Sequence, residues 1–111
     1  MKTESINYKQ AFEIVSKWVE AATDGAAEIC NVEDKSYGWV FYYQSKNYDQ
    51  NDISTYLAGN APIIFDRVSS EIRITGTAFN IDHYLKVYEA TLPQTRLIMS
   101  PEPSGFKGKC K

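Results

Sequence analysis

The sequence predicts an α+β fold with an N-terminal helix, a four-stranded antiparallel meander, and a C-terminal helix packed on one face of the sheet. Apolar residues recur at helical spacing in residues 8–22 and again in residues 81–88, and four short strand-like runs separated by turns lie between them. The chain has 111 residues, of which 43% are hydrophobic, enough for one core and too few for two. We therefore expect one domain over residues 1–90 and a tail over residues 91–111.

The first predicted element is an amphipathic helix. Asn7 and Gln10 have the three-residue spacing of a capping box, and Asp24-Gly25 is a typical stop signal. Between them, one helical face is apolar and the opposite face is charged or polar. The apolar face consists of Tyr8, Ala11, Ile14, Val15, Trp18, Val19 and Ala22. This pattern predicts a helix of roughly four turns that covers one face of a sheet.

The second and third elements are predicted to form an antiparallel hairpin. Residues 26–32 alternate between apolar and polar, residues 33–36 form a polar turn, and residues 38–45 are the most aromatic run in the chain. Large side chains throughout residues 38–45 favour a central strand. We expect the face with Trp39, Phe41 and Tyr43 to lie under the helices, which leaves the face with Val40 and Tyr42 open.

The rest of the chain supplies two short strands and a second helix. Residues 63–65 and 71–75 are predicted as strands. Asn80 is placed to cap a helix over residues 81–89. This helix and the N-terminal helix are expected to cover the same face of the sheet. In the tail we expect an edge strand at residues 96–99, followed by a disordered basic end.

Charge is unevenly distributed along the chain. The net charge is −2, but the tail holds four Lys or Arg residues against Glu102 alone, so it carries +3 and residues 1–90 carry −5. An acidic body argues against nucleic-acid binding and favours a basic partner. We find no apolar run long enough to span a membrane and no signal peptide at the N-terminus, so a cytoplasmic location is expected.

The sequence contains little material for catalysis or metal binding. Cys30 and Cys110 are the only cysteines and are expected to stay free in a cytosolic protein. His83 is the single histidine and is predicted to lie in the first turn of the second helix. A Cys30–His83 pair stays open as a catalytic alternative, but no metal-ligand cluster or phosphate-binding loop is present. We predict no enzyme activity and no cofactor.

Four stretches together suggest a family. Gly38–Ser45, Gly59–Asp66, Thr75–Ala78 and His83–Glu89 resemble the immunity protein 35 family over roughly residues 7–89. The resemblance implies a small bacterial protein that is encoded beside a toxin and neutralises it, and some relatives are described as small heat-stable, chaperone-like proteins. The resemblance implies that the family's motif residues maintain the fold in this chain and do not contact the toxin. They are Trp39, Gly59, Asn60, Pro62 and Tyr84.

The leading hypothesis is therefore an immunity protein that binds a cognate toxin and blocks its active site or an essential surface. The alternative is a chaperone-like protein that holds unfolded chains through an exposed aromatic patch. A homodimer is left open as an additional assembly. Tyrosines and acidic residues near the open face are predicted to form the contact surface. These residues are Glu33, Asp34, Tyr42, Tyr48, Asp49, Asp52 and Tyr56.

Overall fold

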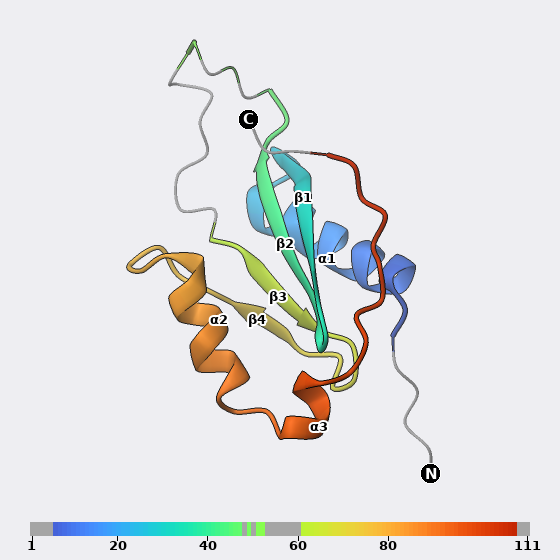
Figure 1. The fold of residues 1–111 in the computed structure, drawn as a ribbon. Helices are drawn as coiled ribbons and strands as arrows, with labels where there is room; N and C mark the ends of the chain where they lie inside the picture. The colour runs from blue at the N-terminus through green and yellow to red at the C-terminus, as the bar shows by residue number, and fades with distance from the viewer. Residues whose placement is uncertain (1–5, 48, 50, 53–60, 109–111) are drawn as a thin grey trace.

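The computed structural model describes residues 6–47, 49, 51–52 and 61–108, and in this part of the chain the predicted α+β fold is confirmed. One helix, four strands and two further helices follow in order (Figure 1). Their bounds are α1 Tyr8–Thr23, β1 Ala27–Lys35, β2 Gly38–Ser45, β3 Ile63–Asp66, β4 Ile72–Ile74, α2 Ile81–Glu89 and α3 Gln94–Leu97.

Helix α1 begins and ends at the predicted signals. The Asn7 side chain accepts the Gln10 N–H at 2.8 Å, and the Gln10 side chain accepts the Asn7 N–H at 3.2 Å. This capping box satisfies two donors that lack partners within the helix. At the other end Asp24 adopts the left-handed conformation, with φ of 54°, and stops the helix. Local sequence therefore sets the length of α1.

The strands form one antiparallel sheet in the order β1-β2-β3-β4. Strand β1 continues through residues 33–35, which were predicted to be turn, so the hairpin turn is Ser36 and Tyr37. Gly38 then begins β2, where an added Cβ would lie 1.9 Å from the carbonyl oxygen of Phe65 on β3. A side chain at residue 38 would thus force β2 and β3 apart.

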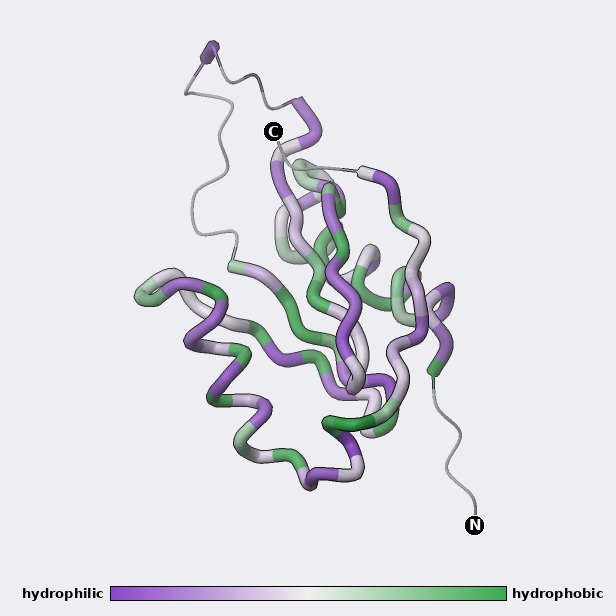
Figure 2. Tube along the Cα trace, in the orientation of Figure 1, coloured by the Kyte–Doolittle hydropathy of each residue, from purple (hydrophilic) through white to green (hydrophobic). Residues whose placement is uncertain are grey.

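The sheet carries an apolar core on each face. Trp39, Phe41 and Tyr43 pack with the buried side of α1, as predicted. Val40 and Ile64 point to the opposite face and pack with α2. In Figure 1, α1 and α2 lie on opposite sides of the sheet, and in Figure 2 hydrophobic and hydrophilic residues alternate along α2, as expected for a helix with one buried side.

The prediction that both helices cover the same face is therefore wrong. Helix α2 packs on one face of the sheet, but this is the face opposite α1. The physical reason is that β2 is apolar on both faces, so each face requires cover. The periodicity of a helix shows which of its own sides is buried, but it does not indicate which face of a sheet it meets.

The tail departs from its prediction in two ways. The expected edge strand at residues 96–99 is wrong, because residues 94–97 form helix α3. The expectation of disorder is also wrong for residues 101–108, which run beside α1 and β1. The Glu102 carbonyl accepts the Trp39 indole N–H at 2.9 Å, and the Glu102 carboxylate accepts the Tyr8 N–H at 2.5 Å. Phe106 packs on Phe12 with ring centroids 6.0 Å apart.

The expectation that Cys30 is a free thiol is wrong as well. Cys30 is disulfide-bonded, and it lies where the β1–β2 register shifts between Ile29 and Asn31. A Cβ added to Gly108 would lie 2.9 Å from the Cys30 carbonyl oxygen, so the tail passes directly beside this residue. The chain's other cysteine, Cys110, is outside the described residues. Close packing of the tail on β1 could not be read from the spacing of the cysteines.

Candidate partner-binding surface

Tyr42 lies on the α2 side of β2, at the margin of the second core. It is half-buried, packs against the second core as Ile81 of α2 also does, and donates its hydroxyl to the Glu33 carboxylate at 3.3 Å. Burial, then the Glu33 charge and hydrogen bond, and finally the Asp82 charge raise the pKa of Tyr42 to about 12. Tyr42 therefore stays a neutral hydrogen-bond donor at physiological pH, with two carboxylates close by.

Glu33, Tyr42 and Asp82 together form what we name the acidic-aromatic surface. Glu33 is exposed on β1 and pairs with the ammonium group of Lys35 at 2.8 Å, so its charge is partly offset. Asp82 lies in the first turn of α2, where a carboxylate is favoured by the helix dipole. Two elements far apart in sequence thus bring acidic groups to the same tyrosine.

Asp34 does not join this surface. Successive residues of a strand point to opposite faces, so Asp34 lies on the α1 side, directly across from Trp39. Its carboxylate accepts the Ser104 N–H at 3.2 Å, which ties it to the tail. The polar run at residues 33–36 was predicted to be a turn, and in a turn both carboxylates would have been neighbours. Because β1 continues through Lys35, Glu33 and Asp34 point to opposite faces of the sheet.

The loop after β2 contributes two exposed acidic residues. Asp49 and Asp52 face each other in a short bridge, with the Asp52 N–H donating to the Asp49 carbonyl at 2.9 Å. The Asp49 carboxylate also accepts the Asn51 N–H at 2.9 Å. The two predicted contact residues Tyr48 and Tyr56 lie outside the described residues. The loop therefore offers acidic groups, held partly by the backbone.

The start of α2 adds an aromatic group that sequence reasoning missed. Asn80 caps the helix by accepting the His83 N–H at 3.1 Å, as predicted. Phe79, just before the cap, is 59% exposed and packs on His83 in a tilted arrangement with ring centroids 4.2 Å apart. The position before an N-cap is often apolar, and this signal could have identified Phe79. Asp82 was missed because its proximity to Tyr42 depends on tertiary packing.

The catalytic alternative loses its nucleophile in this structure. A Cys–His pair needs a free thiolate, but Cys30 is disulfide-bonded and His83 is exposed against Phe79. Across the described ranges, no group of three or more His, Cys, Asp or Glu side chains is arranged to hold a metal ion. Of the helices in those ranges, none is long and apolar enough to cross a membrane.

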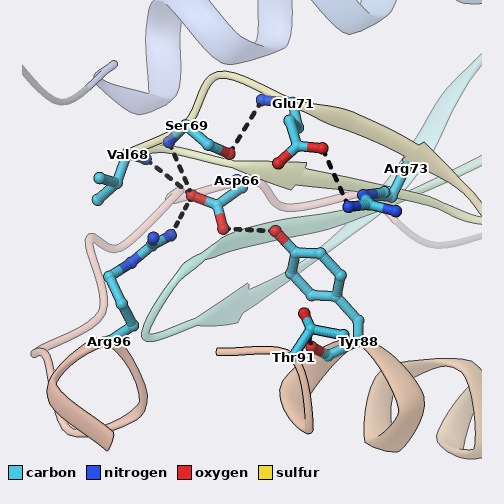
Figure 3. Close-up of polar contacts among 8 residues, drawn as sticks. All are labelled: Asp66, Val68, Ser69, Glu71, Arg73, Tyr88, Thr91 and Arg96. Carbon is cyan, nitrogen blue, oxygen red and sulfur yellow. Dashed lines mark hydrogen bonds and ion pairs between the residues drawn. The ribbon is translucent and has the colours of Figure 1, made fainter. Parts of the chain in front are cut away.

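A buried carboxylate, Asp66 at the end of β3, accepts several hydrogen bonds on the α2 face of the sheet (Figure 3). It accepts the Tyr88 hydroxyl at 2.5 Å and the backbone N–H groups of Val68 and Ser69 at 2.9 and 3.1 Å. Arg96 of α3 completes the set with an ion pair. Figure 3 shows these groups converging on Asp66 from the turn, from α2 and from α3.

The Asp66 cluster anchors elements and leaves no free carboxylate oxygen for a substrate. Burial alone would raise the pKa of Asp66, but the hydrogen bonds from Tyr88, Ser69, Val68 and Arg96 outweigh it and hold the pKa below its usual value. Conversely, burial and the Asp66 carboxylate raise the pKa of Tyr88. The cluster is therefore an ionised contact in which both Asp66 carboxylate oxygens are hydrogen-bonded, and it attaches α2 and α3 to the sheet.

Comparison with known proteins gives two matches. Residues 9–91 match the family model described as Immunity protein 35. The "Uncharacterized protein YrhB" of Escherichia coli (strain K12) is 42% identical over 55 residues, which cover 49% of this chain. The same alignment covers 58% of that relative, so it leaves more than a third of the relative's length unmatched. No solved structure matches the chain.

Proposed function

Because the chain belongs to the immunity protein 35 family, we propose that it binds a cognate bacterial toxin and neutralises it by covering the active site or another surface that the toxin needs. The family match carries this proposal. It extends over most of the chain, from α1 through the whole sheet to the end of α2. The immunity role follows from the family, and the cognate toxin and the mode of inhibition are our proposal.

The acidic-aromatic surface is the part of the molecule that we assign to the toxin. Tyr42 provides rigid contact area with a hydroxyl donor, as is typical of residues that dominate protein interfaces. Glu33 and Asp82 flank it, and the exposed Asp49 and Asp52 extend the negative charge onto the loop. Acidic groups of this kind speed the approach of a basic partner. We therefore expect the contacted surface of the toxin to be basic.

Two predicted contact residues that the structure does not describe complete the assignment. Tyr48 and Tyr56 lie between β2 and β3 in the sequence, as Asp49 does, and stay predicted contacts. Asp34 also stays a predicted contact, but its position on the α1 side means that a single flat interface through Tyr42 would not include it. Substitution of Asp34 therefore separates a broad contact from one confined to the α2 side.

Co-expression with the toxin encoded next to this gene tests the proposal. We expect the chain to restore growth and to elute with the toxin as a complex on a sizing column. Failure in both assays would refute toxin neutralisation. Tyr42→Ala is expected to weaken the complex by about 2 kcal/mol, or roughly 30-fold in Kd, if Tyr42 is a central contact.

Charge reversals provide a matched control for the surface. Glu33→Lys with Asp82→Lys should slow association with the toxin and reduce growth rescue, because they turn an attractive surface repulsive. Glu13→Lys with Glu20→Lys makes the same change of four charge units on the exposed side of α1, where Glu13 pairs only loosely with Lys17 at 3.9 Å. Equal losses of toxin binding for the charge reversals at the acidic-aromatic surface and on α1 would show that net charge, and not this surface, controls binding.

A chaperone-like activity is a second candidate, favoured by the exposed apolar side chains of the α2 region. Phe79 and Val87 are 59% and 57% exposed. Holding of unfolded chains predicts suppressed aggregation of unrelated heated proteins, and Phe79→Ser should reduce it. Stoichiometric toxin binding predicts neither effect, so one aggregation assay distinguishes the two functions.

We propose the cytoplasm as the site of action, in line with the sequence-based expectation. The disulfide at Cys30 bears on this point, because cytosolic thiols are usually kept reduced. Trapping of free thiols in rapidly lysed cells, followed by mass spectrometry of the Cys30 peptide, measures its state. An oxidised Cys30 together with a periplasmic fraction would place the protein outside the cytoplasm.

A further inference from the structure

We propose that the outer edge of β4 is a dimerisation surface that pairs with β4 of a second copy of this chain. This goes beyond toxin binding and does not depend on it. Strand β4 is the last in the sheet order, and among the described strands it has no neighbour beyond β3. An edge strand presents unpaired backbone groups that another strand satisfies readily.

The hydrogen-bond pattern shows which backbone groups face outward. The Thr75 N–H donates to Pro62 at 3.2 Å, and the Asp66 N–H donates to Glu71 at 3.0 Å. Hydrogen-bonded positions alternate in an antiparallel pair, so the backbone groups of residues 71, 73 and 75 point to β3. Those of Ile72 and Ile74 therefore point away from the sheet.

This alternation of inward-facing and outward-facing backbone groups along β4 limits how two copies can pair. Antiparallel β4 strands that meet at their outer edges must place Ile72 or Ile74 opposite Ile72 or Ile74 of the second copy. Centring the pair on Ile72 places Glu71 opposite Arg73 of the other copy, and does so twice by symmetry. Shifting by one step places Arg73 opposite Arg73, where like charges repel. Centring the pair on Ile74 places Arg73 opposite Thr75, where no ion pair can form. Charge complementarity thus selects the pairing centred on Ile72.

The side chains at this edge suit such a contact. Glu71 and Arg73 are about half-exposed and already form an ion pair at 3.1 Å along the strand (Figure 3). The Arg73 guanidinium lies 5.4 Å from the centre of the Tyr88 ring, which holds it on the α2 face of β4. Ile74 and Val87 are each 57% exposed and line the same shallow groove of about 160 Å³. A second copy would cover apolar surface as well as pair charges.

The opposite edge of the sheet is less suited to this role. Strand β1 carries an irregularity between Ile29 and Asn31, and a bulge of this kind interrupts regular strand addition. The tail also lies beside it, with Ser104 bonded to Asp34 and Gly108 close to Cys30. The pairing surface therefore lies at β4, and because β4 has three residues the dimer should be weak and dependent on concentration.

Sedimentation velocity of the full chain over a wide concentration range measures this association. We expect the wild-type mass to rise from 12.6 kDa toward twice that value. Arg73→Glu or Glu71→Arg alone should raise the dimer dissociation constant at least tenfold, because each creates like-charge contacts across the pair. Lys17→Glu on α1, an exposed cation with a similar intrachain partner, is the matched control and should leave dimerisation unchanged.

Mixing the two single variants gives the sharpest result. Glu71→Arg and Arg73→Glu should each be monomeric when alone but form a mixed dimer together, and the double variant should dimerise like wild type. Circular dichroism verifies that each variant is folded. A wild type that stays monomeric at all concentrations would overturn the proposal, as would single variants that fail to form the mixed dimer. Loss of toxin binding by Arg73→Glu in a monomeric wild type would assign this edge to the toxin instead.

Discussion

The two faces of the sheet are stabilised by different chemistry. On the α1 side, Val15 and Val19 are completely buried against Trp39 and Phe41, and the core is almost entirely apolar. On the α2 side fewer apolar groups are buried, and the Asp66 cluster supplies much of the attachment. These polar contacts attach α2 to the sheet at a few points, and they leave that face less completely buried than the α1 face. This difference explains why Tyr42 is half-exposed whereas Phe41, its neighbour, is fully buried.

Removal of residues 92–111 should have the largest effect, because the tail contributes to both faces. Loss of Arg96 leaves the buried Asp66 without its cation, and loss of Glu102 leaves the Trp39 indole N–H without its acceptor. Breaking a buried pair and leaving a donor unsatisfied cost at least about 5 kcal/mol together. Urea denaturation followed by circular dichroism measures the loss. An unchanged midpoint would show that residues 1–91 fold without the tail.

Paired core truncations compare the two faces directly. Phe41→Ala on the α1 side should cost about 4 kcal/mol, and Leu85→Ala on the α2 side about 2–3 kcal/mol. Phe41 is completely buried, whereas Leu85 is 5% exposed and sits in a smaller cluster. Thermal and urea unfolding of both variants give the free energies. A larger loss for Leu85→Ala would contradict the view that apolar packing matters more on the α1 side.

Asp66→Asn tests the polar attachment and its pH dependence. We expect a loss of about 2–3 kcal/mol at neutral pH, because Arg96 and the turn N–H groups lose a charged acceptor. The folded-state pKa of Asp66 lies below its ordinary value of 3.8, so its contribution is fully present above that pH. The contribution is lost as pH falls through the lowered folded value. Acid unfolding of wild type should therefore show a pH dependence that the variant lacks.

Glu33→Gln should have the smallest effect on stability, below about 0.5 kcal/mol, because Glu33 is exposed. Its effect should appear in the titration of Tyr42, whose pKa of about 12 should fall once the Glu33 charge is removed but stay above its ordinary value of 10, because burial is the largest cause of the shift. Ultraviolet difference titration against Tyr42→Phe isolates this hydroxyl. The neutral Tyr42 hydroxyl contributes to the stability of the folded state below pH 10. This contribution is lost as pH rises from 10 to 12, because the pKa in the folded state is the higher one.

The parts of the fold that depend on neighbours in sequence were predictable. Asn7, Gln10 and Asp24 define α1 through contacts within a few residues, and Asn80 does the same for α2. The strands β2 and β3 follow from their apolar character. Local rules of capping and periodicity were sufficient for these elements.

The parts that depend on distant contacts were not predictable. Asp66 is completely buried because Tyr88 and Arg96 reach it from residues well along the chain. Tyr42 and Glu33 were predicted as neighbouring contact residues and the structure brings them within a hydrogen bond, but Asp82 comes close to Tyr42 only through the docking of α2. Asp34 stays a predicted contact but lies on the α1 side, because a residue counted as turn is part of β1. Register and helix docking decide these positions, and neither is encoded locally.

The position of Glu102 has a consequence for biosynthesis. This residue contacts Tyr8, 94 positions earlier, as well as Trp39 in the middle of the sheet. Ribosomes make the chain from its N-terminus, so α1 and the sheet exist for some time before Glu102 does. A nascent or prematurely terminated chain lacks the acceptor for the Trp39 indole and the contact at the first turn of α1. The contacts at Tyr8 and Trp39 can therefore form only after residue 102 has been made.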